Sequence, residues 1–319
     1  MKLALAGDTM LGRGVAEALA SCGSVDSLVA PEVVAIAAEA DLFLLNLECC
    51  ISGRGEPWPE PGKPFFFRAP PRATELLAHL GVDCVTLANN HALDYGEVAL
   101  LDTLAHLEEA GIRWVGAGAT VEEARAPVIL EGRGGALTVV AATDHPPVYA
   151  AEPDRPGVAY AELERGVPGW LRELVLKQHK VRPVLATMHW GPNMVAEPMP
   201  HVRAAARELR AAGAALVAGH SAHVCHGAGD RILYDLGDFL DDYAVDRRLR
   251  NDLGLLFLVT FADAEAVRLE AVPLELEYCH TRLADGDDAA WIRARFHSAC
   301  AELGTAVTEE EGRLVVEWG

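Results

Sequence analysis

Residues 216–238 read LVAGHSAHVCHGAGDRILYDLGD and contain two short apolar runs that each lead into polar side chains. The first run opens onto Gly219-His220-Ser221-Ala222-His223, and the second opens onto Asp235-Leu236-Gly237-Asp238. A short apolar run bounded by turn residues indicates a buried strand. In open α/β sheets, ligand sites form where loops from separate strands converge at their carboxyl ends. The stretch therefore predicts an α/β fold with a site at one sheet edge.

Four other apolar runs end in the same way. They are residues 3–6 before Asp8, 42–45 before Asn46 and Glu48, 85–87 before Asn89, Asn90 and His91, and 184–187 before His189. Carboxylate, amide and imidazole groups all serve as ligands of divalent metals. Because six runs would deliver such groups to one edge, the sequence predicts an enzyme, and specifically a metalloenzyme.

The segments between these runs have helical character. Residues 70–80, 97–110 and 202–212 are expected helices, and each is followed by a glycine, the usual residue after a helix end. Residues 253–261 and 266–277 have strand-like patterns, and a helix near 288–303 and a strand at 313–317 follow. Strands alternating with helices are typical of α/β proteins. We assign residues 1–262 to an α/β domain and 263–319 to a C-terminal β/α extension packed on it.

Composition narrows the class of partner and the location. The net charge is −20, with 47 acidic against 27 basic residues, which argues against nucleic-acid binding but allows an anionic small-molecule or peptide substrate. Residues 1–8 are too briefly apolar for a signal sequence, and no apolar stretch is long enough to cross a bilayer. Seven cysteines without a Cys-x-x-Cys pair indicate reduced thiols. These features predict a cytoplasmic protein without a membrane anchor.

Two of the polar segments contain the residues that indicate metal binding and acid–base chemistry most directly. His220 and His223, three residues apart in a turn, can bind one metal ion or two adjacent ones, although buried structural histidines give the same pattern. In the segment after residue 87, an Asn amide oxygen can be a neutral ligand while His91 stays free for acid chemistry. Asp94 can then fix the tautomer of His91, whereas the alternative is a turn-forming Asn pair with a capping Asp.

The order of these motifs resembles that of the CapA family of poly-γ-glutamate capsule-synthesis proteins, which are similar to calcineurin-like metallophosphoesterases. The motifs are GDTMLGR at residues 7–13, NLE at 46–48, KPFFFR at 63–68, LANNHALDYG at 87–96, HWG at 189–191, GHSAHV at 219–224 and YDLGDF at 234–239. The resemblance implies a four-layer sandwich, in which two mixed sheets face each other and helices flank them.

The resemblance also implies roles for individual residues. One or two divalent ions (Mn, Fe or Zn) would be bound by Asp8 and His223, and by Asn90, His189 and His220, with Glu48 between the two positions. His91 would be the catalytic histidine, assisted by Asp94. Arg13, Lys63 and Arg68 would be candidates for gripping a carboxylate or phosphate of the substrate.

The sequence departs from the pattern at several positions. Met10 stands where phosphoesterases of the wider superfamily usually have a His ligand, which weakens or empties one metal position. Pro192 and Asn193 follow the HWG motif where capsule proteins usually carry Glu-Tyr, and His226 stands where Gln is usual. The leading hypothesis is a metal-dependent hydrolase of a phosphoester or of a glutamyl or peptide amide bond. The alternatives are a peptide epimerase and a non-catalytic accessory protein of poly-γ-glutamate metabolism.

Overall fold

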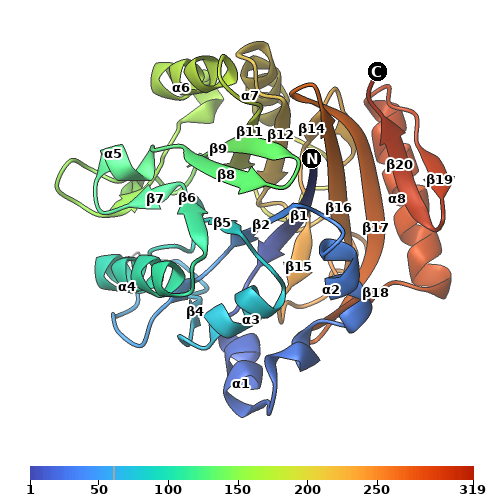
Figure 1. The fold of residues 1–319 in the computed structure, drawn as a ribbon. Coiled ribbons are helices and arrows are strands. Elements are labelled where there is room, and N and C mark those ends of the chain that lie inside the picture. The colour runs from blue at the N-terminus through green and yellow to red at the C-terminus, as the bar shows by residue number, and fades with distance from the viewer. Residues whose placement is uncertain (60–61) are drawn as a thin grey trace.

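The computed structural model describes residues 1–59 and 62–319 and shows a mixed α/β fold built around two sheets (Figure 1). The larger sheet contains β1 (Lys2–Thr9), β2 (Leu42–Leu47), β5 (Cys84–Thr86), β6 (Arg113–Val115), β15 (Asp238–Leu240), β16 (Leu253–Ala262), β17 (Glu265–Glu277), β18 (His280–Leu283), β19 (Thr308–Glu310) and β20 (Arg313–Glu317). The second sheet contains β8 (Val128–Gly132), β9 (Gly135–Thr143), β11 (Val184–His189), β12 (Leu216–His220), β13 (Ala228–Gly229) and β14 (Ile232–Leu233). Short pairings join β3 (Cys50–Ile51) to β4 (Arg68–Ala69) and β7 (Ala117–Gly118) to β10 (Gly157–Val158).

Both sheets have a parallel centre, which brings several strand ends to the same edge. The strand order of the larger sheet is β19-β20-β17-β16-β1-β2-β5-β6, with β15 also on β1 and β18 also on β17. Within it, β1, β2, β5 and β6 run parallel. The second sheet has the order β13-β14-β12-β11-β9-β8, and β9, β11, β12 and β14 run parallel. The carboxyl ends of the central strands are therefore aligned within each sheet.

Alternating side chains of each strand build separate cores on its two faces. Leu3 and Leu5 of β1 belong to a buried cluster that also contains Val139, Leu185 and Ala218 of the second sheet, so the two sheets pack against each other. On the opposite face of β1, Ala4 and Ala6 belong to a buried cluster shared with the helices of the N-terminal half of the chain: α1 (Arg13–Ser21), α2 (Pro31–Ala37), α3 (Ala73–His79) and α4 (Gly96–Glu109). The outer face of the second sheet is covered by α6 (Gly169–His179) and α7 (Pro200–Ala211).

The C-terminal residues extend the same sheet and core. Strand β17 pairs with β16 along most of its length, and β20 pairs with β17 in turn. Helix α8 (Gly286–Glu302) inserts Ile292, Phe296 and Cys300 into the cluster between the sheets. The division at residues 262 and 263 falls in the β16–β17 turn, and the two-part domain assignment stays a prediction.

The predicted α/β class is confirmed, and most elements lie where the sequence indicates. Each of the six apolar runs overlaps a strand, and the expected helices are α3, α4, α7 and α8. Gly81 and Gly111 follow α3 and α4 with φ of +75° and +74°, the left-handed conformation typical of a helix C-terminus. Helices α1, α2, α5 (Val121–Ala124) and α6, and the β8–β9 hairpin, were not predicted. In the part of the chain that the structure describes, no helix is both long and apolar enough to span a membrane.

Candidate metal centre

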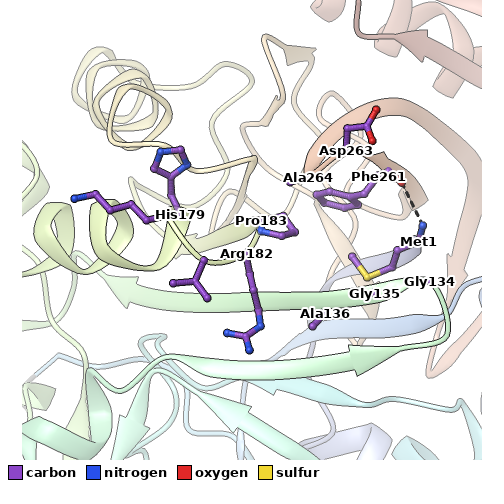
Figure 2. A pocket seen from close by; sticks show the side chains of 12 residues that line it. Met1, Gly134, Gly135, Ala136, His179, Arg182, Pro183, Phe261, Asp263 and Ala264 are labelled. Atoms are coloured by element: carbon purple, nitrogen blue, oxygen red, sulfur yellow. Dashed lines mark hydrogen bonds between the residues drawn. The ribbon is translucent and has the colours of Figure 1, made fainter.

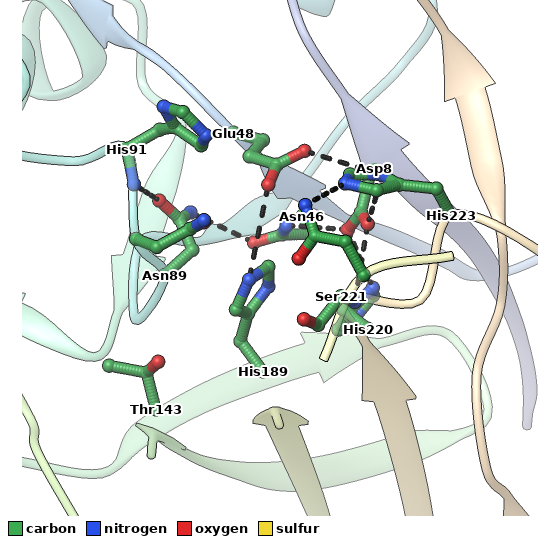
Figure 3. Close-up of polar contacts among 12 residues, drawn as sticks. Asp8, Asn46, Glu48, Asn89, His91, Thr143, His189, His220, Ser221 and His223 are labelled. Atoms are coloured by element: carbon green, nitrogen blue, oxygen red, sulfur yellow. Dashed lines mark hydrogen bonds and ion pairs between the residues drawn. The ribbon is translucent and has the colours of Figure 1, made fainter. Parts of the chain in front are cut away.

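Strand register brings the predicted ligands to two facing edges. In the larger sheet, Asp8 of β1 pairs with Asn46 of β2 on one side and with Asp238 of β15 on the other. In the second sheet, His189 of β11 pairs with His220 of β12. Figure 3 shows the side chains of Asp8, Asn46, His189 and His220 pointing toward one another, with Glu48 and His223 beside them. The polar groups that follow separate strands therefore form one cluster.

Asp8 is the hub of this cluster. Its Oδ1 accepts a hydrogen bond of 2.7 Å from the Asn46 amide and lies 3.4 Å from His220 Nδ1. Its Oδ2 lies 3.3 Å from His223 Nδ1 and accepts a hydrogen bond of 3.3 Å from the backbone N–H of Ser221. One fully buried carboxylate thus contacts groups from both sheets.

Glu48 stands beside Asp8, also fully buried. Its Oε2 accepts a hydrogen bond of 3.3 Å from the Tyr243 hydroxyl and lies 3.9 Å from His223 Nδ1. Its Oε1 lies 3.9 Å from His189 Nε2. Ligand atoms of Asp8, Glu48 and His223 all lie within 4.8 Å of one another, a spacing that suits a shared metal ion.

Several buried polar atoms around these residues make no hydrogen bond within the described part of the chain. Within residues 1–59 and 62–319, atoms of this kind include Glu48 Oε1, Asn90 Oδ1, both ring nitrogens of His189, His220 Nδ1 and Asp238 Oδ2. Buried polar atoms are nearly always hydrogen-bonded, and leaving one unpaired costs about 1–3 kcal/mol. A cluster of unpaired oxygens and imidazole nitrogens fits the preferences of a divalent metal ion.

Burial and close charges set unusual proton affinities here. Burial raises the pKa of Asp8, but the close imidazoles of His220 and His223 outweigh it and hold that pKa well below its usual value. Burial and the neighbouring Asp8 charge raise the pKa of Glu48 well above its usual value. Burial lowers the pKa of His223, but Asp238 and Glu48 outweigh it and raise that pKa well above normal. Burial keeps the pKa of His189 well below normal. Metal ions compete with protons for ligand groups of this kind.

Beside the cluster, His91 and Asp94 form the contact that the sequence predicts. His91 Nδ1 lies 2.6 Å from Asp94 Oδ2, and the Phe67 ring stacks on the imidazole at 4.0 Å. Asp94 also accepts hydrogen bonds from the Phe67 backbone N–H and from the Tyr149 hydroxyl. Burial lowers the pKa of His91, which favours the neutral form of the ring.

The three predicted anion-binding cations already have partners. Arg13 forms an ion pair with Asp242, and Lys63 Nζ lies 3.0 Å from Asp94 Oδ1 and donates to the Asn90 carbonyl. Arg68 donates to backbone carbonyls at residues 54 and 55 and stacks over Tyr95 at 4.0 Å. Arg13 borders a cavity at the centre, whereas Arg68 points to the Tyr95 side. Their role as anion-binding groups stays a prediction.

Two of the noted departures have a structural explanation. Met10 is fully buried, and its sulfur accepts a hydrogen bond of 3.1 Å from the Gly12 N–H, so it stabilises a turn. His226 is buried, and its Nε2 lies 2.9 Å from the Val195 carbonyl oxygen. Met10 therefore has a structural role in this turn, and His226 lies outside the ligand cluster.

Some residues at the centre were not assigned from the sequence. Asp144 and His145 directly follow β9, and the His145 ring lies 5.2 Å from that of His189. They carry the same signal of an apolar run followed by polar groups, so the pattern was sufficient to find them. Asn193, whose amide lies 3.1 Å from His223 Nε2, and Tyr243 come from irregular loops that have no such signal.

A cavity of about 480 Å³ lies at the other end of the sheets (Figure 2). It is lined by Met1, whose amino group donates to the Phe261 carbonyl, and by turn residues such as Gly134, Arg182 and Asp263. Strand β1 begins beside this cavity and carries Asp8 at its far end. The cavity is therefore separated from the metal-ligand cluster by the length of the strand.

Comparison with known proteins agrees with the motif order. The sequence model of the family described as "Bacterial capsule synthesis protein PGA_cap" matches residues 2–243. The chain belongs to this family. A protein of Mycobacterium tuberculosis named "Probable polyglutamine synthesis accessory protein" is 32% identical over 292 residues, which cover 86% of this chain and 76% of that protein. The PGA biosynthesis protein CapA of Bacillus subtilis is 28% identical over 242 residues, covering 74% of this chain and 62% of that protein.

These matches confirm the predicted relationship to the CapA proteins. Among solved structures, a hypothetical protein from Thermus thermophilus aligns with a TM-score of 0.52 at 18% identity, covering 86% of this chain and 99% of that chain. At this identity the likeness concerns the fold alone. The family model ends at residue 243, so β16, β17 and α8 lie outside the matched range.

Proposed function

We propose that this protein is a metal-dependent hydrolase that cleaves a phosphoester or a glutamyl or peptide amide bond. The observation that carries the proposal is the set of unpaired oxygens and imidazole nitrogens buried between the two sheets. Asp8, Glu48 and His223 would hold one divalent ion, and Asn90, His189 and His220 would serve a second. The mixed oxygen and nitrogen donors suit Mn, Fe or Zn. Such an ion supplies Lewis acidity and lowers the pKa of bound water.

In this proposal His91 handles the proton of the leaving group. Its Nδ1–H is held by Asp94 at 2.6 Å, which fixes the tautomer and leaves Nε2 to exchange a proton with the substrate. Lys63 neutralises part of the charge on Asp94. The stacked Phe67 ring excludes water from one face of the imidazole. This arrangement positions His91 for general acid–base chemistry without making it a ligand.

Two further parts of the proposal concern fold and location. The four-layer, calcineurin-like arrangement is supported by two sheets that share a core and by helices on both outer faces. A cytoplasmic location is supported by the seven cysteines, all of which are free and six of which are buried.

A non-catalytic accessory role is the second candidate. The relative from Mycobacterium tuberculosis carries the words "accessory protein" in its name, and Met10 removes one ligand from the site. An accessory protein could use a single structural ion. It would have no need for a buried His91 held by Asp94 beside a cavity.

Metal analysis of protein purified without chelator tests the proposal. We expect near-stoichiometric Mn, Fe or Zn in the wild type and background metal in a His189→Ala/His220→Ala double variant. His226→Gln is the matched control, since His226 is also buried but bonds a backbone carbonyl, and it should keep its metal. Metal that is absent from the wild type, or retained in the double variant, would reject the site.

Activity separates the hydrolase from the accessory protein. Phosphoesters and glutamyl peptides should be screened with each of Mn²⁺, Fe²⁺ and Zn²⁺. For any substrate found, His91→Ala should retain metal and lose roughly 10²–10⁴-fold in turnover. A metal-loaded wild type that cleaves neither class supports the accessory role, and a fully active His91→Ala variant rules out the proton-transfer role.

A further inference from the structure

A cavity of about 550 Å³ opens directly beside the metal centre. His91 and His223 line its inner end, and Asn193 lines the wall next to His223. This volume is within the range of small-molecule binding sites. A substrate whose reacting bond lies at the metal centre would place its remaining part in this cavity.

The walls of the cavity are largely aromatic. Phe65, Phe67, Tyr243 and Tyr278 all line it, and the rings of Phe65 and Phe67 are stacked with centroids 6.3 Å apart. Phe65 is 54% exposed and Tyr278 is 74% exposed, so both present ring surface that the protein itself does not cover. Large rings left open beside a catalytic cluster favour a ligand that is flat or apolar.

Tyr278 reaches the cavity from the turn between β17 and β18, outside the segment matched by the family model. Its hydroxyl lies over Gly14 on α1, only 2.3 Å from where a Cβ at position 14 would be. The missing side chain at Gly14 therefore lets the tyrosine lie against the helix. The outer wall of the cavity is thus built by the C-terminal part of this chain.

The basic side chains around the cavity are already paired with carboxylates. Arg13 is the one Lys or Arg among the described residues that line it, and it is paired with Asp242, its Nε lying 3.0 Å from Oδ1. Its guanidinium also lies 4.9 Å from the centre of the Phe67 ring. Lys63 is only 10% exposed and is paired with Asp94. A polyanionic chain would therefore find no unpaired Lys or Arg among the described residues that line the cavity.

We propose that this cavity binds an uncharged aromatic or similarly apolar substituent of the substrate, and that Tyr278 sets this preference. The inference rests on the proposed hydrolase function, because it places the reacting bond at the metal centre. The expected substrates are aryl or apolar esters and amides, and polyglutamate chains are expected to bind less well. Burial of a ring against Phe65 and Tyr278 supplies the affinity.

Binding of small probes tests the inference without requiring turnover, and the two phosphonates used contain no bond that a hydrolase of this kind cleaves. Phenylphosphonate, methylphosphonate and γ-glutamylglutamate should be titrated by calorimetry into the full chain supplied with Mn²⁺. We expect phenylphosphonate to bind at least about tenfold more tightly than methylphosphonate. It should also bind more tightly than γ-glutamylglutamate.

Substitutions then test whether Tyr278 sets the preference of the cavity for a ring. Tyr278→Ala should reduce the preference for phenylphosphonate to less than about threefold while leaving methylphosphonate affinity unchanged. Tyr278→Phe should keep the preference because it keeps the ring. Leu176→Ala, which removes a comparably exposed apolar side chain on α6, should also keep it.

The outcomes separate the two proposals. Equal affinity for the two phosphonates, tighter binding of γ-glutamylglutamate, failure of every probe to bind, or an unchanged preference in Tyr278→Ala would overturn the cavity assignment, even in an active hydrolase. A preference that depends on Tyr278 would support the cavity assignment. If no ester or amide is then cleaved, the hydrolase proposal fails by itself.

Discussion

The two sheet edges that meet at the metal centre contribute different chemistry. The larger sheet supplies oxygen, from Asp8 at the end of β1, Glu48 just after β2, and Asp238 at the start of β15. The second sheet supplies nitrogen, from His189 and His220 at the ends of β11 and β12. Oxygen and nitrogen ligands therefore reach one another only because the sheets pack face to face.

The difference in chemistry also explains the unusual proton affinities. Burial raises the pKa of Glu48 and of Asp238 on the oxygen side and lowers the pKa of His189 on the nitrogen side. Either sheet edge alone would bury side chains whose charged forms are disfavoured by burial. A cation between the edges favours ionised carboxylates and neutral imidazoles together. Metal binding should consequently stabilise the packing of the two sheets.

Removing the charge of Asp8 should have the largest effect on metal binding by the larger sheet. Asp8→Asn keeps the size of the side chain and its contact with the Asn46 amide but loses the carboxylate that faces His220 and His223. We expect metal affinity to fall by more than about 1,000-fold, because even residues that only orient a ligand contribute 10–100-fold. Metal titration by calorimetry measures the loss.

A second carboxylate provides the control for this substitution. Asp102 on α4 is paired with Arg54 outside the cluster, so Asp102→Asn should leave metal affinity unchanged. If Asp8→Asn retained wild-type metal affinity, Asp8 would not be a ligand, and the oxygen ligands of the larger sheet would have to be Glu48 and Asp238.

The sequence was sufficient to predict which strand ends bring polar side chains together. An apolar run followed by a polar residue is a local signal, and parallel strands necessarily bring such ends to one edge. Asp8, Glu48, His189, His220 and His223 were identified in this way, and their side chains do lie together. The same signal at β9 was overlooked, although Asp144 and His145 follow that strand.

What the sequence could not predict depends on pairing between distant loops. Tyr243 reaches Glu48 across 195 positions, and Asn193 reaches His223 from a loop whose local pattern indicates nothing. Arg13 was expected to bind a substrate anion, but Asp242, 229 positions away, is its partner in the folded chain. Tertiary packing alone determines which charged side chains pair, so local sequence patterns cannot show that Arg13 in the cavity wall is paired with Asp242.

His226 lies outside the ligand cluster, and its burial should make the free energy of unfolding depend on pH. Burial lowers the pKa of His226 to about 4, whereas an unfolded chain has a value of 6.5. Below pH 6.5 the unfolded chain therefore gains a proton that the folded chain does not, and stability is lost as the pH falls toward 4. The loss approaches about 3 kcal/mol. His226→Gln can still donate to the Val195 carbonyl but should not show this loss.

Chemical denaturation of both metal-free proteins at pH 7 and pH 4 measures the effect. The difference in free energy of unfolding between wild type and His226→Gln should change by about 3 kcal/mol between the two pH values, since the carboxylates common to both proteins cancel. A difference that stays constant with pH would mean that His226 is not buried as a neutral group.

The smallest effect should come from the hydroxyl that supports Glu48 on the oxygen edge. Tyr243→Phe keeps the ring, which packs edge-on against His223 at 5.2 Å, and removes only the 3.3 Å hydrogen bond to Glu48 Oε2. We expect metal affinity to fall by about tenfold, the lower end of the range for residues that orient a ligand. Tyr278→Phe is the matched control, because its hydroxyl lies over Gly14 instead. Equal affinities in the two variants would mean that Tyr243 shapes the cavity without holding Glu48, leaving that carboxylate positioned by Asp8 and the imidazoles.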